Sequence, residues 1–442
     1  MKQKADLIVG INEHVSPGRA IFLGFQHILS MDLYVFPILL AGMIGLSGSD
    51  ASYLIQMCFF TCGLATIIQT GLGIQLPVVQ GSSFVALSAL AAIGSTQGMD
   101  VLVGSLIPGA ILLCLLGVTK VFAKIIHRCV PAYIGGLVIM IVGISLTSTA
   151  ASGVISNSGG LLNNLIPGLS AMIVLLILNI YGYKTQYKHK YISLFSVIIA
   201  LVIGCMVSGF MGTLHFDAVG QAAWFQIPSI FHYGLPQFDA SSCILMIFIY
   251  FIVLIETTGV WFTVSDVTGE ELTDERLNRA VIGEGIGCLL GACFGGTPLT
   301  GYSLNAGVIS ITKIGSRSVV ITCGILLSLM GLCPKLMAVI ASVPGCVISG
   351  VFLVICQILI ANGLKIVMKE EMSQKRILVI GLSIVFTVSS MVISADAMAS
   401  FPTVVQYFLS SGTAVGGLSA VLLNLILPED APALKQKEVN AE

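Results

Sequence analysis

The feature that most constrains this chain is a succession of long apolar segments that runs from near its start to near its end. Segments of about 17–25 mostly apolar residues are long enough for a helix to cross a bilayer. Only 9% of the residues are charged and 56% are hydrophobic, whereas soluble domains carry about a quarter charged residues. This chain is therefore expected to be an all-α polytopic membrane protein. Its net charge of −1 gives no basic field for nucleic acid.

Fourteen segments are predicted to cross the membrane, and those at 77–95, 280–294 and 298–314 are weaker than the rest. They lie at 22–46, 52–72, 77–95, 101–119, 132–149, 163–181, 191–211, 242–264, 280–294, 298–314, 318–334, 338–364, 376–394 and 404–427.

Basic residues test this count. With a cytoplasmic N-terminus, every one of the 20 lysines and arginines except Lys335 falls in a terminus or a cytoplasmic connection. Such an excess of positive charge on the cytoplasmic side is the usual orientation signal. Both termini are therefore predicted to be cytoplasmic, in a multi-pass protein of the inner (plasma) membrane.

The longest polar gap, 212–241, contains no Lys or Arg and divides the segments into two sets of seven. An odd number in each half makes the second half enter the membrane from the opposite side. This arrangement is the inverted repeat of many secondary transporters. The sequence thus predicts a 7+7 inverted repeat joined by an extracytoplasmic connection.

The third segment of each half carries a matching interruption. Residues 76–84 read LPVVQGSSF, and residues 295–305 read GGTPLTGYSLN. Pro and Gly disfavour a continuous helix, and unwound backbone at membrane depth must be buried in protein or line a cavity. Spans 3 and 10 are therefore expected to be partly unwound, each with a short strand and a half-helix. Paired interruptions of this kind point to a transporter's binding site.

Three carboxylates fall inside predicted spans, namely Asp32, Glu256 and Glu284. A charged residue at the centre of a membrane helix costs about 2.5–3.5 kcal/mol on insertion scales. These acids should therefore face a polar cavity or each other. Gln26 and His27 open the first span, where His27 is either a hydrogen-bonded packing residue or a tether between span 1 and the site.

Several elements, in this order, resemble the nucleobase–ascorbate transporters, also called nucleobase:cation symporters or xanthine/uracil permeases. They are Gln26-His27, Gln80-Gly81-Ser82-Ser83-Phe84, Glu256-Thr257-Thr258-Gly259, Glu284, and the signature-like Leu304-Asn305-Ala306-Gly307 with Thr312-Lys313.

The resemblance implies that family's fold, in which a core domain moves against a gate domain. The core would comprise spans 1–4 and 8–11, and the gate spans 5–7 and 12–14. The corresponding ranges are 1–21 for the N-terminus, 22–119 and 242–334 for the core, 120–211 and 335–427 for the gate, 212–241 for the connection and 428–442 for the C-terminus.

The resemblance also implies uptake of a nucleobase coupled to a proton, with sodium as the alternative ion. By position, Glu256 would accept N–H bonds from the base, with Phe84 and Tyr302 beside it. Ser83, Ser303 and the backbone near Leu304 would meet its oxygens.

Two further roles follow from the same resemblance. Glu284 would be the proton-linked acid, and Asn305 would brace the broken span, with Gln26 and His27 supporting the site.

Two residues depart from the family pattern. Leu304 stands where Gln, Glu or Pro is usual, and Asp32 stands where the family is generally uncharged. The run at 73–77 and the Glu-Thr-Thr-Gly motif favour the xanthine/urate branch over the uracil branch. The expected function is therefore proton symport of an oxidised purine, xanthine or urate, by alternating access.

Several alternatives remain beside this reading. A uracil or other purine permease belongs to the same family, and a sulfate-type anion transporter shares the fold. An intramembrane protease, suggested by the GLSG run at 45–48, and a channel fit less well. No HExxH or Cys/His cluster occurs, so no metal site is expected. As a transporter, the protein is expected to have no cofactor and no enzymatic activity. Small residues on the apolar gate helices are compatible with a homodimer.

Overall fold

Apolar segments become helices in this protein because a helix pairs its backbone polar groups within itself, as a medium without water requires. The computed structural model describes residues 7–46, 48–129, 131–155, 160–185, 192 and 195–428. Eight of its helices are long and apolar enough to cross a membrane. They are α3 (Gly48–Gly71), α5 (Met99–Val118), α7 (Ala132–Ile155), α8 (Leu161–Lys184), α12 (Ala240–Thr268), α13 (Asp274–Phe294), α17 (Gly345–Val367) and α18 (Gln374–Met391).

Three further pairs of helices pass the same test together but are bent at a break. They are α1 (Pro17–Ser30) with α2 (Val35–Ile44) at 41°, α15 (Arg317–Gly331) with α16 (Pro334–Ala341) at 85°, and α20 (Thr403–Ser410) with α21 (Gly412–Ile426) at 91°. Length and composition thus support up to 11 spans among the described residues. The count of fourteen stays a prediction.

The remaining helices are shorter. They are η1 (Phe84–Ala86), α4 (Leu87–Gln97), α6 (Val121–Cys129), α10 (Ser196–Phe210), α11 (Asp217–Gln221), α14 (Ser303–Thr312) and α19 (Ala395–Ala399). Ser47 of the GLSG run, and all but the first residue of the predicted C-terminus 428–442, lie outside the described residues.

Both interrupted segments contain a short strand followed by a helix. β1 (Gln80–Ser82) precedes η1 and α4, and β2 (Leu299–Gly301) precedes α14. The two strands pair antiparallel, with Gly81 opposite Thr300. Segments more than 200 residues apart in the sequence are therefore joined through their backbones in the interior.

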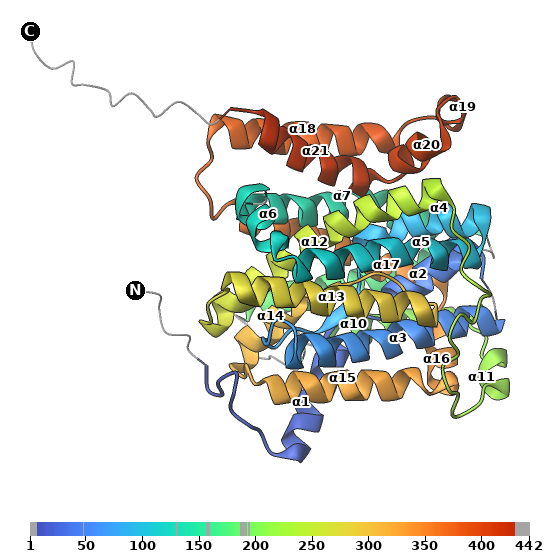
Figure 1. The fold of residues 1–442 in the computed structure, drawn as a ribbon. Helices are drawn as coiled ribbons and strands as arrows, with labels where there is room; N and C mark the ends of the chain where they lie inside the picture. The colour runs from blue at the N-terminus through green and yellow to red at the C-terminus, as the bar shows by residue number, and fades with distance from the viewer. Residues whose placement is uncertain are drawn as a thin grey trace, which may run out of the picture.

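The long helices pack side by side in layers (Figure 1). α3 packs on α15 and α13, and α5 packs on α13 and α12. α7 packs on α17, α8 on α10, and α18 on α21. In the view of Figure 1, α18, α20 and α21 form the top layer and α15 lies near the bottom, with α3 and α13 above it.

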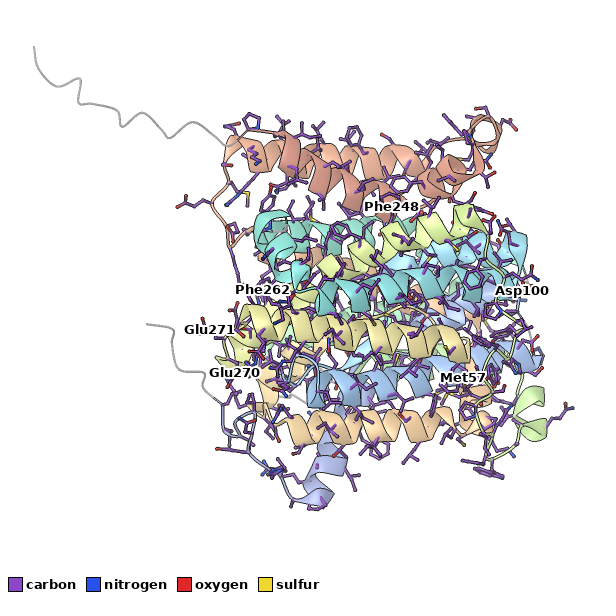
Figure 2. The ribbon with its side chains drawn as sticks, viewed as in Figure 1. Met57, Asp100, Phe248, Phe262, Glu270 and Glu271 are labelled. Carbon is purple, nitrogen blue, oxygen red and sulfur yellow. The ribbon has the colours of Figure 1, made fainter. Side chains whose placement is uncertain are left out.

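Apolar side chains cover the outside of the bundle between two charged ends. On α8 and α10, Ile173, Ile177 and Val202 are about half exposed. Figure 2 shows Glu270 and Glu271 at one end of the helices and Asp100 at the other. An apolar band between polar ends is the surface that a bilayer requires, so the protein is an integral membrane protein.

Polar caps mark the ends of the helices. Asp239 begins α12 and accepts a hydrogen bond from the backbone N–H of Ser242 at 2.8 Å. This bond holds the pKa of the Asp239 carboxyl below its usual range. At the other end of the bundle, Arg276 and Glu270 form an ion pair at 3.1 Å.

The segment before α1 is tied to the connection that follows α14. The backbone N–H of Ile8 donates to the Lys313 carbonyl at 2.8 Å, and the N–H of Gly315 donates to the Val9 carbonyl at 2.9 Å. The N-terminal segment therefore lies at the same end of the bundle as Lys313. The side of the membrane on which this end lies stays a prediction.

Close packing of α3 on α15 generates a test of the fold. A Cβ atom at Gly63 would collide with the Ser328 hydroxyl and the Gly324 carbonyl. Gly63→Ala is therefore expected to lower the thermal unfolding midpoint of the detergent-solubilised protein, since overpacking costs about 1–3 kcal/mol. Gly71→Ala at the end of the same helix meets nothing within 4 Å and serves as the control. It should unfold at or above the wild-type temperature, because Ala favours helix over Gly by about 1 kcal/mol. Equal midpoints for the two variants would contradict the packing.

Candidate functional site

The candidate site is built around the β1–β2 pair. The pairing continues on both flanks, where the N–H of Ser83 donates to the Pro298 carbonyl and the N–H of Tyr302 donates to the Val79 carbonyl, each at 2.9 Å. Unwound backbone is thereby satisfied without water. Each strand then passes directly into a helix, so two helix N-termini begin beside the same sheet.

Neither helix is capped by its own N-cap side chain. Ser83 precedes η1 and Tyr302 precedes α14, and neither side chain accepts a bond from its helix. The first N–H groups of a helix have no intrahelical acceptor and carry a partial positive charge. These two ends can therefore bind carbonyl oxygens or negative charge.

A cavity of about 400 Å³ lies against this sheet, a size that suits a small molecule. One wall comes from β1, β2, the helices that follow them, and α12. The other wall comes from α7, α8, α10 and α17. The wall near the sheet contains Ser82, Phe84, Glu256, Val260, Thr300, Gly301, Tyr302 and Leu304.

Glu256 projects from α12 into this cavity although its side chain is only 7% exposed. The Ser83 hydroxyl donates to its Oε2 atom at 2.7 Å. Thr300 lies close to the carboxylate without reaching hydrogen-bond geometry. A carboxylate has about four lone-pair positions, so Glu256 retains acceptor capacity towards the cavity.

Glu284 lies on α13, buried behind the sheet, and does not line the cavity. The Gln69 amide donates to its Oε2 at 2.9 Å, and the Thr257 hydroxyl donates to its Oε1 at 3.4 Å. Thr257 also accepts the N–H of Gly301 at 2.9 Å. A single hydroxyl therefore links this acid to β2, and it belongs to the residue that directly follows Glu256.

The supporting residues hold the two broken segments together. The Asn305 amide, fully buried, donates to the Pro77 carbonyl and so joins α14 to the segment before β1. Gln26 and His27 are buried in α1 but do not line the cavity.

The structure thus brings four of the predicted substrate residues to one cavity, namely Phe84, Glu256, Tyr302 and Leu304. Ser83 reaches the site through Glu256. Ser303 begins α14, but its side chain lies outside the described residues.

Sequence reasoning missed several polar residues of this region. Gln69 and Thr257 surround Glu284, and the Thr66 hydroxyl accepts the N–H of Gln80 at 2.9 Å. Asn179 and Gln357 line the far wall of the cavity. The available signal was their position, because a Gln or Asn within an apolar span rarely faces lipid.

Comparison with known proteins settles the family. A family model described as Permease family, with the short name Xan_ur_permease, matches residues 18–395. The chain belongs to this family, the nucleobase–ascorbate transporters. The predicted resemblance is confirmed.

Relatives of this permease match over nearly its whole length. It is 31% identical to the uric acid permease PucJ of Bacillus subtilis, over 91% of both chains. It is 30% identical to the xanthine permease of the same organism, covering 92% of this chain and 94% of the relative. The uric acid transporter UacT of Escherichia coli is also 30% identical, over 94% of this chain and 87% of the relative.

Solved structures with the same fold come from anion transporters. The transmembrane domain of the cyanobacterial bicarbonate transporter BicA matches 93% of this permease with a TM-score of 0.59 and 15% identity, and 99% of that chain is covered. SLC26A9 matches 92% with a TM-score of 0.60 and 13% identity, covering 65% of that chain. At these identities the likeness concerns the fold alone.

The Thr257 link gives a prediction for this permease. Thr257→Val keeps the side-chain shape but leaves the Gly301 N–H without its acceptor, which costs about 1–3 kcal/mol in a buried position. The unfolding midpoint should therefore fall. Thr258→Val is the matched control, since the neighbouring buried hydroxyl bonds only to the Leu254 carbonyl of its own helix at 2.6 Å. The link is refuted if both variants melt together.

Proposed function

We propose that this permease is a secondary active transporter that imports a nucleobase, an oxidised purine such as xanthine or urate, in symport with a proton. The observation that carries the proposal is a buried carboxylate, Glu256, facing a cavity between two broken helices. A second buried acid, Glu284, lies one hydroxyl away from the same sheet. Uric acid and xanthine permeases among its relatives support the substrate class.

A nucleobase matches the chemistry of this cavity. It is flat and carries N–H donors beside carbonyl acceptors. Glu256 would accept N–H bonds, while the uncapped helix ends near Phe84 and Leu304 would donate to its oxygens. The Phe84 ring is held by Phe352, stacked at 5.2 Å, and by the edge of Phe36 at 5.5 Å. A ring fixed in this way can position a planar base at little entropic cost.

Coupling would run through the Glu284–Thr257–Gly301 chain of hydrogen bonds. A hydroxyl can donate or accept, so a protonated Glu284 would donate a hydrogen bond to Thr257 instead of accepting one. Because the same hydroxyl accepts the Gly301 N–H, this reversal would alter a hydrogen bond of β2. In the proposed cycle, Glu284 takes up a proton from outside, the base binds, and both are released inside. Such linkage is reciprocal, so the base must favour protonation as much as the proton favours the base. Sodium remains the alternative ion.

We also propose that the chain forms fourteen spans in a 7+7 inverted repeat, with both termini in the cytoplasm and the inner membrane as its location. Helix contacts support the repeat. If each helix is replaced by its counterpart in the other half, the contact α3–α15 becomes α13–α5, and the contact α8–α10 becomes α18–α21; all four contacts are present. The contacts α7–α17 and β1–β2 convert into themselves. The cavity lies between the proposed core and gate, where alternating access would open it to each side in turn.

Anion transport is the second candidate, because BicA and SLC26A9 share the fold. Charge weighs against it. Both charged side chains among the residues that line the cavity are acidic, Asp32 and Glu256. An inorganic anion would meet repulsion there.

The function is tested by uptake of radiolabelled xanthine into cells without purine carriers of their own. Wild-type protein should accumulate xanthine, and a protonophore should abolish the accumulation. Glu256→Gln should reduce affinity at least tenfold, since it loses a hydrogen bond to a charged group worth about 1.5–3 kcal/mol. Glu275→Gln, at the charged start of α13 outside the cavity, is the control and should transport normally. Normal xanthine affinity in Glu256→Gln would show that the Glu256 carboxylate does not bind the substrate.

The Glu284 variant separates binding from coupling. Glu284→Gln cannot take up a proton but preserves the shape of the side chain between Gln69 and Thr257. It should exchange internal for external xanthine while losing accumulation that responds to the protonophore. Both processes are measured in vesicles from one preparation: vesicles loaded with xanthine report exchange, and empty vesicles report accumulation. Gradient-driven accumulation at the wild-type level would show that the coupling acid lies elsewhere.

A further inference from the structure

The substrate cavity holds a second carboxylate that the proposed mechanism does not use. Asp32 lines the cavity together with Glu256, and the described lining residues include no Lys, Arg or His. The charged side chains among the described lining residues are therefore all acidic. Tyr302, which also lines the cavity, lies within electrostatic range of both carboxylates.

Asp32 occupies the break between α1 and α2. Its backbone carbonyl accepts the N–H of Val35 at 2.9 Å and so starts α2. Its side chain is only 2% exposed, yet within the described part of the chain it receives no hydrogen bond from another residue and no ion pair. Its own backbone N–H lies close to the carboxyl group. A buried carboxylate supported by that donor alone is unfavourable unless something else satisfies its remaining acceptor positions. The cavity is the side from which such a partner can come.

A second unsatisfied group faces the same space. The Thr300 hydroxyl lies in the middle of β2, is 3% exposed and lines the cavity. Among the residues that the structure describes, it has no hydrogen-bond partner. Two buried polar groups on different elements are thus left for a ligand to satisfy.

Leu304 lines the cavity at the start of α14, and its side chain offers no hydrogen bond. Asp32 supplies polarity to the same cavity from another helix. The cavity therefore combines an apolar side chain on α14 with an acceptor at the α1–α2 break. Because an ionised carboxylate only accepts, this arrangement restricts which edges of a base can bind.

We propose that Asp32 is a specificity-determining residue that adapts this cavity to neutral purines with N–H donors on two separate edges. Xanthine and guanine belong to this class. Glu256 accepts from one edge and Asp32 from the other. Urate, which carries a negative charge at neutral pH, is disfavoured between two carboxylates. The inference rests on the proposed function and refines its substrate class, because it retains xanthine, adds guanine and disfavours urate.

The experiment measures uptake of radiolabelled xanthine, guanine and urate in parallel by cells without their own purine carriers. Wild-type protein should take up xanthine and guanine at least tenfold more efficiently than urate. Asp32→Asn keeps the side-chain shape and removes the charge. It should shrink the xanthine-to-urate ratio by about tenfold, the size expected for loss of a hydrogen bond to a charged group.

Two further variants serve as controls for the effect of Asp32→Asn. Asp32→Glu retains the charge and should retain a preference against urate. Asp396→Asn removes an exposed acid on α19, away from the cavity, and should leave the ratio unchanged. The ratio compares two substrates in one variant, so it does not depend on how much folded protein reaches the membrane.

The outcomes distinguish the two proposals. Efficient urate uptake by the wild type, or an unchanged ratio in Asp32→Asn, would overturn the role of Asp32 while purine uptake leaves the proposed function standing. Absence of uptake of all three bases, by protein shown to be folded in the membrane, would overturn the proposed function and this inference with it.

Discussion

The pairing of β1 with β2 is the interaction on which the rest of the site depends. In a bilayer, a chain that leaves the helical conformation exposes N–H and C=O groups for which no water is present. Here each interrupted segment satisfies the other, through the ladder between Gly81 and Thr300 and its continuation to Pro298 and Val79. Neither interruption is tolerable alone. The two must fold together, and this requirement fixes the centre of the molecule.

Chemistry follows from the same pairing. Once the strands meet, the helices after them begin at one place and present uncapped N–H groups to a shared cavity. Hydroxyl groups around the strands then connect two acids to the sheet, Ser83 to Glu256 and Thr257 to Glu284. One acid faces the cavity and the other is sealed behind it. This division underlies the proposed function, in which a base binds at one carboxylate and a proton at the other.

Much of this arrangement was predictable because it rests on local rules. Pro and Gly in 76–84 and 295–305 disfavour helix wherever they occur, and a carboxylate in an apolar span must face polar groups or a polar cavity. Glu256 was therefore assignable to a polar site before any coordinates, whereas Phe84, Tyr302 and Leu304 were assigned to it by the family resemblance. Gln69 and Thr257 were not. Gln69 lies in an apolar span and Thr257 follows Glu256, but their importance comes from which atoms they meet across the fold, and the sequence does not give those partners.

The sequence by itself determined the class of protein, the two interrupted segments and the inventory of buried acids, because hydropathy, charge and helix breaking are properties of short stretches. Only the tertiary structure decided that Glu284 stays behind the sheet while Asp32 reaches the cavity. The physical reason is that a side chain's partners depend on how distant helices pack. Two acids in equally apolar segments differ only in what the packed neighbours place beside them.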